Sequence, residues 1–111
     1  MAYLREEKEN LEVSYSIKAV WEAIPKAIAK LEWRIEESNE ESYHLKVKTK
    51  GAFLAYPSVL KIDLRSIDEK TTRMSVEAET PVTTITSVLD YGRTRERIEM
   101  FVGTLAKLMS S

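Results

Sequence analysis

The last part of the chain carries a broad apolar face, and this feature most constrains the fold. Its apolar residues recur at three- and four-residue steps, the spacing of an α-helix: Ile98, Phe101, Val102, Leu105, Leu108 and Met109. The charged residues fall mostly off this face: Arg95, Arg97, Glu99 and Lys107. Because so wide an apolar stripe must be covered by another layer, the upstream chain is expected to supply a sheet.

Five upstream segments alternate apolar and polar residues, the period of a strand with one buried face. Their expected inward residues are Leu11, Val13 and Tyr15; Trp33 and Ile35; Tyr43, Leu45, Val47 and Thr49; Leu60, Ile62 and Leu64; and Met74, Val76 and Ala78. We expect the polar run from Glu36 to Ser42 to form a turn, and Pro81 to end the last strand.

Between the first two of these segments, a helical spacing predicts a helix from about Ile17 to Glu32, with Ser16 as its N-cap. Pro25 removes a backbone hydrogen bond inside this helix, so we expect a kink or two short helices meeting there. The predicted order is strand, helix, four strands, helix.

Short polar turns join the last four strands, which predicts an antiparallel meander with the first strand beside the fifth. The predicted class is α+β, in two layers with the order β-α-β-β-β-β-α. A curved antiparallel five-stranded sheet would pack on a long C-terminal helix. A length of 111 residues favours a single domain over residues 1–111.

Composition limits the classes of partner. The 17 basic and 18 acidic residues give a net charge of -1, so we expect no nucleic-acid partner and no attraction to anionic membranes. No segment resembles a secretory signal or is long enough to span a bilayer, which predicts a cytoplasmic protein. Gln is absent and Asn occurs only at Asn10 and Asn39, a composition typical of hyperthermophile proteins.

The residues that usually carry catalysis or bind metal are scarce. There is no cysteine, so a disulfide, a thiolate metal site and a cysteine nucleophile are all excluded. His44 is the single histidine, and on the outward face of a strand it has no evident Ser or Asp partner. Adjacent acidic pairs such as Glu6-Glu7 are typical of solvated turns. We therefore expect no metal site and no cofactor, and the sequence leans away from an enzyme.

The turn before the last helix carries a resemblance. Asp90-Tyr91-Gly92-Arg93 matches a pattern of Asp, an aromatic residue, Gly and a basic residue, and the segment from Val20 to Trp33 matches a first helix and second strand. The chain resembles small prokaryotic domains with the helix-grip architecture of START-like and birch-pollen-allergen-like proteins. That resemblance implies a curved sheet that wraps a C-terminal helix.

Larger helix-grip proteins hold an apolar ligand between sheet and helix, which suggests a pocket here. The apolar loop from Gly51 to Pro57 and the connection from Thr80 to Leu89 would form its rim. The predicted ligand-binding residues are Phe53, Leu54, Tyr56, Val88, Tyr91, Arg93, Phe101 and Leu105. The alternative is that these residues simply fill a close-packed core.

Two charged features have both a functional and a structural interpretation. Asp90 and Arg93 could hold an anionic head group at the start of the helix, or Asp90 could simply cap that helix. The outward stripe from His44 to Lys50 could meet phosphates, but neighbouring acidic residues make a solvated face the simpler interpretation.

The sequence thus favours non-enzymatic binding of an apolar or amphipathic small molecule between the sheet and the last helix. The alternative function is a protein-interaction or self-association module, in which the apolar 51–57 loop docks a partner or a second copy. In the second case the protein would be a homo-oligomer.

Overall fold

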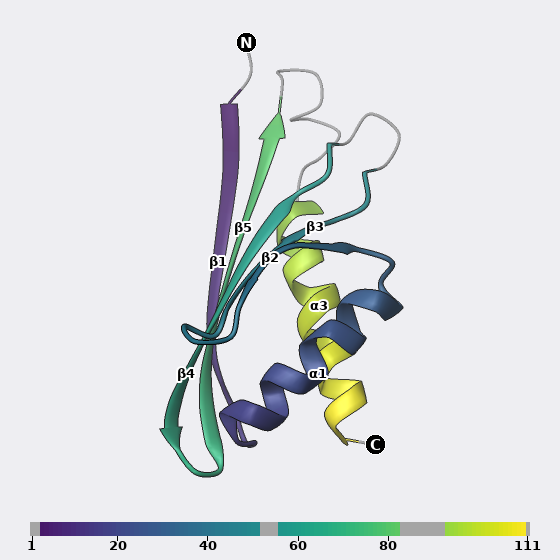
Figure 1. The fold of residues 1–111 in the computed structure, drawn as a ribbon. Helices are drawn as coiled ribbons and strands as arrows, with labels where there is room; N and C mark the ends of the chain where they lie inside the picture. Colours follow the sequence, from purple (N-terminus) through teal and green to yellow (C-terminus); the bar gives the residue numbers. More distant parts are fainter. Residues whose placement is uncertain (1–2, 52–55, 83–92, 111) are drawn as a thin grey trace.

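The computed structural model describes residues 3–51, 56–82 and 93–110. Its helices and strands, in chain order, are β1 (Tyr3–Val13), α1 (Ile17–Lys30), β2 (Arg34–Asn39), β3 (His44–Lys48), β4 (Val59–Asp68), β5 (Thr71–Val82) and α3 (Arg93–Ser110). The strands form a five-stranded antiparallel sheet in the order β1-β5-β4-β3-β2. Both helices pack on one face of this sheet (Figure 1). The predicted α+β architecture is confirmed, including the first strand beside the fifth.

The hydrophobic core lies between the sheet and the two helices. Alternate residues of the inner strands point into it, as the period-two pattern predicts: Leu45, Val47, Leu60, Ile62, Leu64, Met74, Val76 and Ala78 are buried. From the helices, Val20, Ile24, Ala27, Ile28, Ile98, Phe101 and Leu105 meet them. Phe101 is fully buried and is among the largest core side chains, so α3 is fixed to the sheet chiefly by apolar burial.

Both ends of α1 have defined caps. The hydroxyl of Ser16 accepts a hydrogen bond from the Ala19 backbone N–H at 3.2 Å, as predicted. At the other end, the N–H groups of Glu32 and Trp33 reach the carbonyls of Ala29 and Ile28, each at 3.1 Å. This is a Schellman arrangement, and it sets Glu32 at a φ of 62°, a left-handed conformation that glycine adopts more easily.

Pro25 does not divide the first helix. α1 runs unbroken from Ile17 to Lys30 with Pro25 inside it on the exposed side, so the expected pair of short helices is wrong. The buried residues Val20, Ile24 and Ile28 give the helix one continuous apolar face across the proline. Packing of that face against the sheet offsets the missing backbone hydrogen bond.

The edge strands differ most from the predicted elements. β1 begins at Tyr3 and pairs with β5 along its whole length, whereas the pattern predicted a strand only from Leu11. β2 includes the polar residues Glu36 to Asn39, which were expected to form a turn. β5 continues through Pro81 to Val82. β1 and β2 are the edge strands, and they tolerate charged residues because one side of their backbone needs no partner strand. Pro81 of the inner strand β5 fits because it lies beyond Glu79, the last residue that pairs with β4, so β1 is its one partner strand.

The strained position at the end of α1 gives a test of stability. A left-handed conformation costs a non-glycine residue roughly 1–2 kcal/mol, and the greater freedom of an unfolded glycine offsets about 0.4–1 kcal/mol of this. We expect Glu32→Gly to raise the melting temperature by a few degrees in a thermal unfolding scan. Glu32→Gln keeps the strained backbone, so the same scan should show no such rise.

The pH dependence of that gain has a defined sign. A hydrogen bond and the charge of Lys50 lower the pKa of Glu32, whose carboxylate lies 2.8 Å from the Lys50 Nζ atom. A lowered carboxyl pKa stabilises the fold above the unfolded pKa, and this contribution is lost as pH falls through the folded pKa. The gain from Glu32→Gly should therefore grow below the usual carboxyl range; a smaller gain at acidic pH would contradict this assignment.

Candidate functional site: an apolar groove between the sheet edge and the last helix

Two adjoining hollows lie between β1 and α3. One has a volume of about 340 Å³, and its apolar lining is Leu11, Val13, Met74, Val102, Leu105 and Met109. The other has a volume of about 390 Å³ and is lined by Glu9, Leu11, Arg95, Ile98, Glu99, Val102 and Gly103. Because Leu11 and Val102 line both hollows, the two hollows form one surface, which we call the β1–α3 groove. The first is its lower hollow, and the second, which contains Arg95, is its upper hollow.

The two walls of the groove follow from the periods of their elements. On β1, Glu9, Leu11 and Val13 alternate onto the side that faces the helices, and all three are half-buried. On α3, residues 95, 98, 99, 102, 105 and 109 recur at helical spacing along the opposite wall. Met74 of the neighbouring strand β5 forms part of the floor and is fully buried. The groove therefore reaches the core of the sheet–helix layer.

Polar contacts join the two walls at either end of the groove. The guanidinium of Arg95 forms a hydrogen-bonded ion pair with the carboxylate of Glu9, and its Nε atom lies 3.7 Å from a carboxylate oxygen of Glu99. At the other end, the hydroxyl of Tyr15 donates to the backbone carbonyl of Met109 at 2.7 Å. Between these two ends, the groove is lined mainly by apolar side chains. It therefore has an apolar middle and a charged end at Arg95.

A polar cluster lies inside the sheet–helix layer, at the end where β5 stops and α3 begins. Its members are buried: Thr49, Ser58, Thr80, Thr94 and Arg97. Arg97 donates to the Tyr56 carbonyl at 3.0 Å and to the Ser58 hydroxyl. The Ser58 hydroxyl also contacts Thr80, and Thr80 and Thr94 share a hydrogen bond of 2.9 Å. The cluster fastens the start of β4 to β5 and α3.

The burial of Arg97 corrects the sequence analysis, which placed this residue mostly away from the apolar face. Only 7% of Arg97 is exposed. Helical spacing does place Arg97 one turn before Phe101, but its charge favoured the wet face. The groups that bind the guanidinium, the Tyr56 carbonyl and the Ser58 hydroxyl, come near it only in the folded chain. The weak sequence signal was that Ser58 and Thr80 continue the inward-facing positions of two predicted strands.

The predicted ligand-binding residues are only partly covered by the structure. Phe53, Leu54, Val88 and Tyr91 lie outside the described residues, as does Asp90, and of Arg93 only its place as the first residue of α3 is described. Tyr56 is 46% exposed, whereas Phe101 is wholly buried in the core. Leu105 is buried and lines the β1–α3 groove. The sequence predicted a pocket between the sheet and the last helix with its rim at the loops, and it did not identify β1 as a wall of the groove.

The outer face of the sheet carries paired charges. His44 Nδ1 lies 2.7 Å from an oxygen of Asp63, its neighbour across β3 and β4. The expectation that His44 has no Asp partner is therefore wrong. Ser75 is the next residue in the same row, opposite Asp63. The carboxylate thus lies between serine and histidine, whereas nucleophilic catalysis needs the histidine in the middle.

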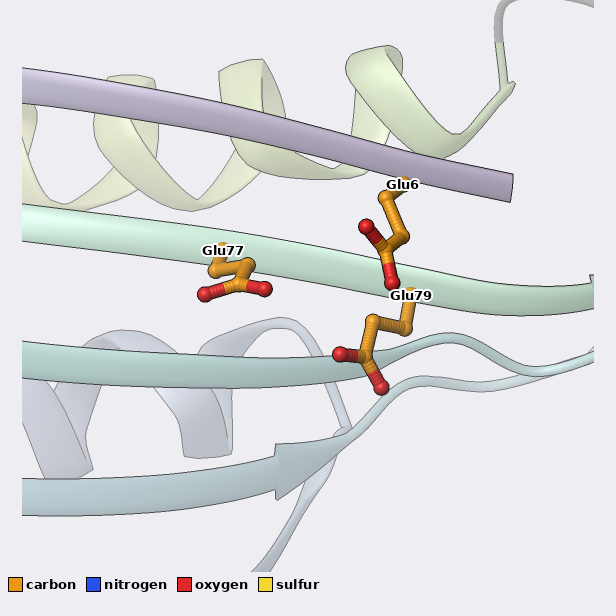
Figure 2. Close-up of side chains that lie close together, drawn as sticks. All are labelled: Glu6, Glu77 and Glu79. Atoms are coloured by element: carbon orange, nitrogen blue, oxygen red, sulfur yellow. The ribbon is translucent and has the colours of Figure 1, made fainter. Parts of the chain in front are cut away.

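Three carboxylates also gather on the outer face, where Glu6 of β1 meets Glu77 and Glu79 of β5 (Figure 2). Their closest oxygens all lie within 4.8 Å of one another. The Nζ atom of Lys61 lies 3.4 Å from Glu79 and neutralises part of this charge. Exposed acidic groups of this kind occur commonly without a metal ion, so the geometry alone does not define a metal centre.

No known protein family matches the sequence, and no curated protein matches it either. Solved structures match it in fold. Norcoclaurine synthase from Thalictrum flavum, in complex with a transition-state analogue, has a TM-score of 0.74 at 12% identity, over 97% of this chain and 95% of that chain. A conserved protein from Geobacillus kaustophilus has a TM-score of 0.71 at 13% identity, over 96% and 95%.

An aromatase/cyclase from Streptomyces sp. R1128 matches with a TM-score of 0.66 at 10% identity, over 95% of this chain and 93% of that chain. The described part of the chain therefore has the helix-grip fold of START-like and birch-pollen-allergen-like proteins, as its sequence suggested. At 10–13% identity, this likeness shows the fold alone.

Among the described helices, none is both long and apolar enough to cross a membrane.

Two arginines on α3 allow a matched test of the polar cluster. Arg97→Ala removes hydrogen bonds from a buried charged group, each worth roughly 1.5–3 kcal/mol, and leaves a cavity. Arg95→Ala removes a half-exposed surface pair, worth about 0–1 kcal/mol. In urea unfolding, we expect Arg97→Ala to lose at least twice as much free energy of unfolding as Arg95→Ala. Equal losses would show that the cluster does not fasten the strand ends.

Proposed function

We propose that this protein binds an apolar or amphipathic small molecule between its sheet and α3, without chemistry on the ligand. The observation that supports this most directly is the apolar hollow of the β1–α3 groove, which has a volume of about 340 Å³ and whose lining includes the buried residues Met74 and Leu105. Its volume falls at the small end of the range for ligand pockets, which is roughly 300–1,000 Å³.

The fold supports the same proposal. A solved structure with this fold, norcoclaurine synthase, holds a transition-state analogue. In the present chain, the groove runs along the seam between sheet and helix, where a ligand would bury apolar surface without separating the two layers. Burial of each CH₂ group would contribute about 0.8 kcal/mol. Leu105 stays in the proposed site, and the other predicted ligand-binding residues remain predictions: Phe53, Leu54, Tyr56, Val88, Tyr91, Arg93 and Phe101.

Two substitutions of alanine by tryptophan, one inside the groove and one outside it, test whether the groove binds the ligand. Ala106 is exposed and lines the groove, whereas Ala29 is equally exposed but lies on α1. We expect the wild-type protein to bind the uncharged fluorophore N-phenyl-1-naphthylamine saturably. Ala106→Trp should then fill the groove and weaken this affinity by about tenfold, or ~1.4 kcal/mol. Ala29→Trp makes the same change in a helix and should leave the affinity unaltered.

A lack of saturable binding by the wild-type protein would contradict the proposed function. Equal effects of the two tryptophan substitutions would place the binding site elsewhere.

Self-association is the second candidate function, and the exposure of Tyr56 favours it. Tyr56 is the last residue but one of the apolar 51–57 loop, and it is 46% exposed. If the loop joins two copies, Phe53→Ser with Tyr56→Ser should lower the dimer fraction in native mass spectrometry over a concentration series, with the melting temperature nearly unchanged. Ile67→Ser is a control, because Ile67 is equally exposed at the far end of β4. A wild-type protein that stays monomeric throughout would contradict this function.

A further inference from the structure

We propose that the ligand of the β1–α3 groove carries a cationic amine, which lies against Glu9 and Glu99 at the charged end of the groove. This inference rests on the proposed function, because it assumes that the apolar part of the groove holds the rest of the ligand. It goes beyond that function by naming the chemical class of the ligand.

The first support is the balance of charge along the groove. Among the described residues that line its upper hollow, the charged ones are Glu9, Glu99 and Arg95. Two carboxylates thus face one guanidinium, which leaves a formal charge of -1. Glu9 and Arg95 are about one-third exposed, at 34% and 37% of their side chains, while Glu99 is 68% exposed. A partly desolvated site of this sign attracts a cation more strongly than a fully solvated one.

The second support is how Arg95 is used. Its guanidinium bonds to Glu9 and lies 3.7 Å from Glu99, so both carboxylates engage the same cation. Glu99 is the less tightly held of the two, and a ligand ammonium can bind its oxygens without breaking the pair between Arg95 and Glu9. An anionic ligand would instead have to separate Arg95 from Glu9 and then lie beside Glu99, which repels it.

The third support is the separation of polar and apolar surface. The lower hollow is lined mainly by apolar side chains, from Leu11 to Met109. Glu12, which also lines it, lies 3.4 Å from Arg73 on the neighbouring strand, so its charge is already balanced. The excess negative charge is therefore confined to the upper hollow, and a molecule that lies along the groove would place its amine there and its apolar part below.

Three eight-carbon probes with different head groups test this inference: octylamine, which is protonated at pH 7, 1-octanol, and octanoate, whose apolar tail is one carbon shorter. Displacement of N-phenyl-1-naphthylamine from the wild-type protein at low salt gives their affinities. We expect octylamine to bind roughly three- to tenfold more tightly than 1-octanol, and octanoate to bind least tightly. Because the carboxylates are partly exposed, this preference should shrink as salt is added.

Charge substitutions on α3 should change the preference in opposite directions. Glu99→Gln removes one carboxylate and should reduce the ratio of octylamine to 1-octanol affinity toward one. Arg95→Gln frees both carboxylates and should increase that ratio. Glu96→Gln is the matched control, because Glu96 is exposed on the same helix and is not among the described residues that line the groove. The ratio of octylamine to 1-octanol affinity of this variant should equal that of the wild type.

The outcomes separate this inference from the proposed function. If 1-octanol binds but octylamine binds no better, or if octanoate binds best, the inference of a cationic amine is wrong. The proposed binding of an apolar molecule is unaffected by that result. The same holds if Glu99→Gln and Arg95→Gln leave the ratio unchanged. If none of the three probes displaces the fluorophore, the proposed function fails and the inference fails with it.

Discussion

The architecture depends on covering a sheet that is wider than one helix. Five strands about 4.8 Å apart span roughly 20 Å, whereas a helix with its side chains is about 10–12 Å across. One helix therefore cannot bury the apolar face, and α1 and α3 share it. α1 lies against β2, β4 and β5, while α3 lies against β5 and β1. α3 covers the β1 edge only in part, since Glu9, Leu11 and Val13 stay half-buried, and this is where the groove opens.

Two different kinds of contact hold α3 in place along its length. In its middle, Ile98, Phe101 and Leu105 are buried against the sheet and contribute non-directional apolar burial. Near its start, Arg97 makes directional hydrogen bonds to Tyr56 and Ser58, which fix the rotation of the helix about its axis. Apolar packing thus determines that the helix covers the sheet, and the polar cluster determines which side of the helix faces inward. The same rotation turns Arg95 and Glu99 toward β1.

Sequence periodicity predicted the parts of the fold that are governed by one-sided burial. Leu60, Ile62 and Leu64 alternate cleanly, and so do Met74, Val76 and Ala78, because one face of each strand is apolar and the other is wet. β1 escaped prediction from Tyr3 to Asn10 because the residues from Arg5 to Glu9 are all charged. A strand at the edge of a sheet can have this composition, and only its partner strand reveals it.

The candidate site could not be predicted in the same way. The groove depends on the spacing between β1 and α3, which no local pattern encodes. Of the predicted site residues that the structure describes, Leu105 is the one found in its lining. The pairing of Arg95 with Glu9 joins residues that are 86 positions apart. The sequence placed Arg95 away from the apolar face and put Glu9 on no predicted element, so it could not bring these two residues together.

The same charges bear on whether a second copy covers the groove by extending the sheet at β1. Two identical antiparallel strands related by a two-fold axis set one residue opposite its own copy. Centred on β1, that residue is Glu7, Lys8 or Glu9, so each of these registers places like charges directly opposite each other. Such pairs are destabilising across strands. The registers centred on Lys8 or Glu9 add further like-charged pairs, Glu7 with Glu9 or Glu6 with Glu12, and are disfavoured. The register centred on Glu7 instead sets Arg5 opposite Glu9 and Glu6 opposite Lys8, so it is the register in which two copies could extend the sheet across β1 and cover the groove.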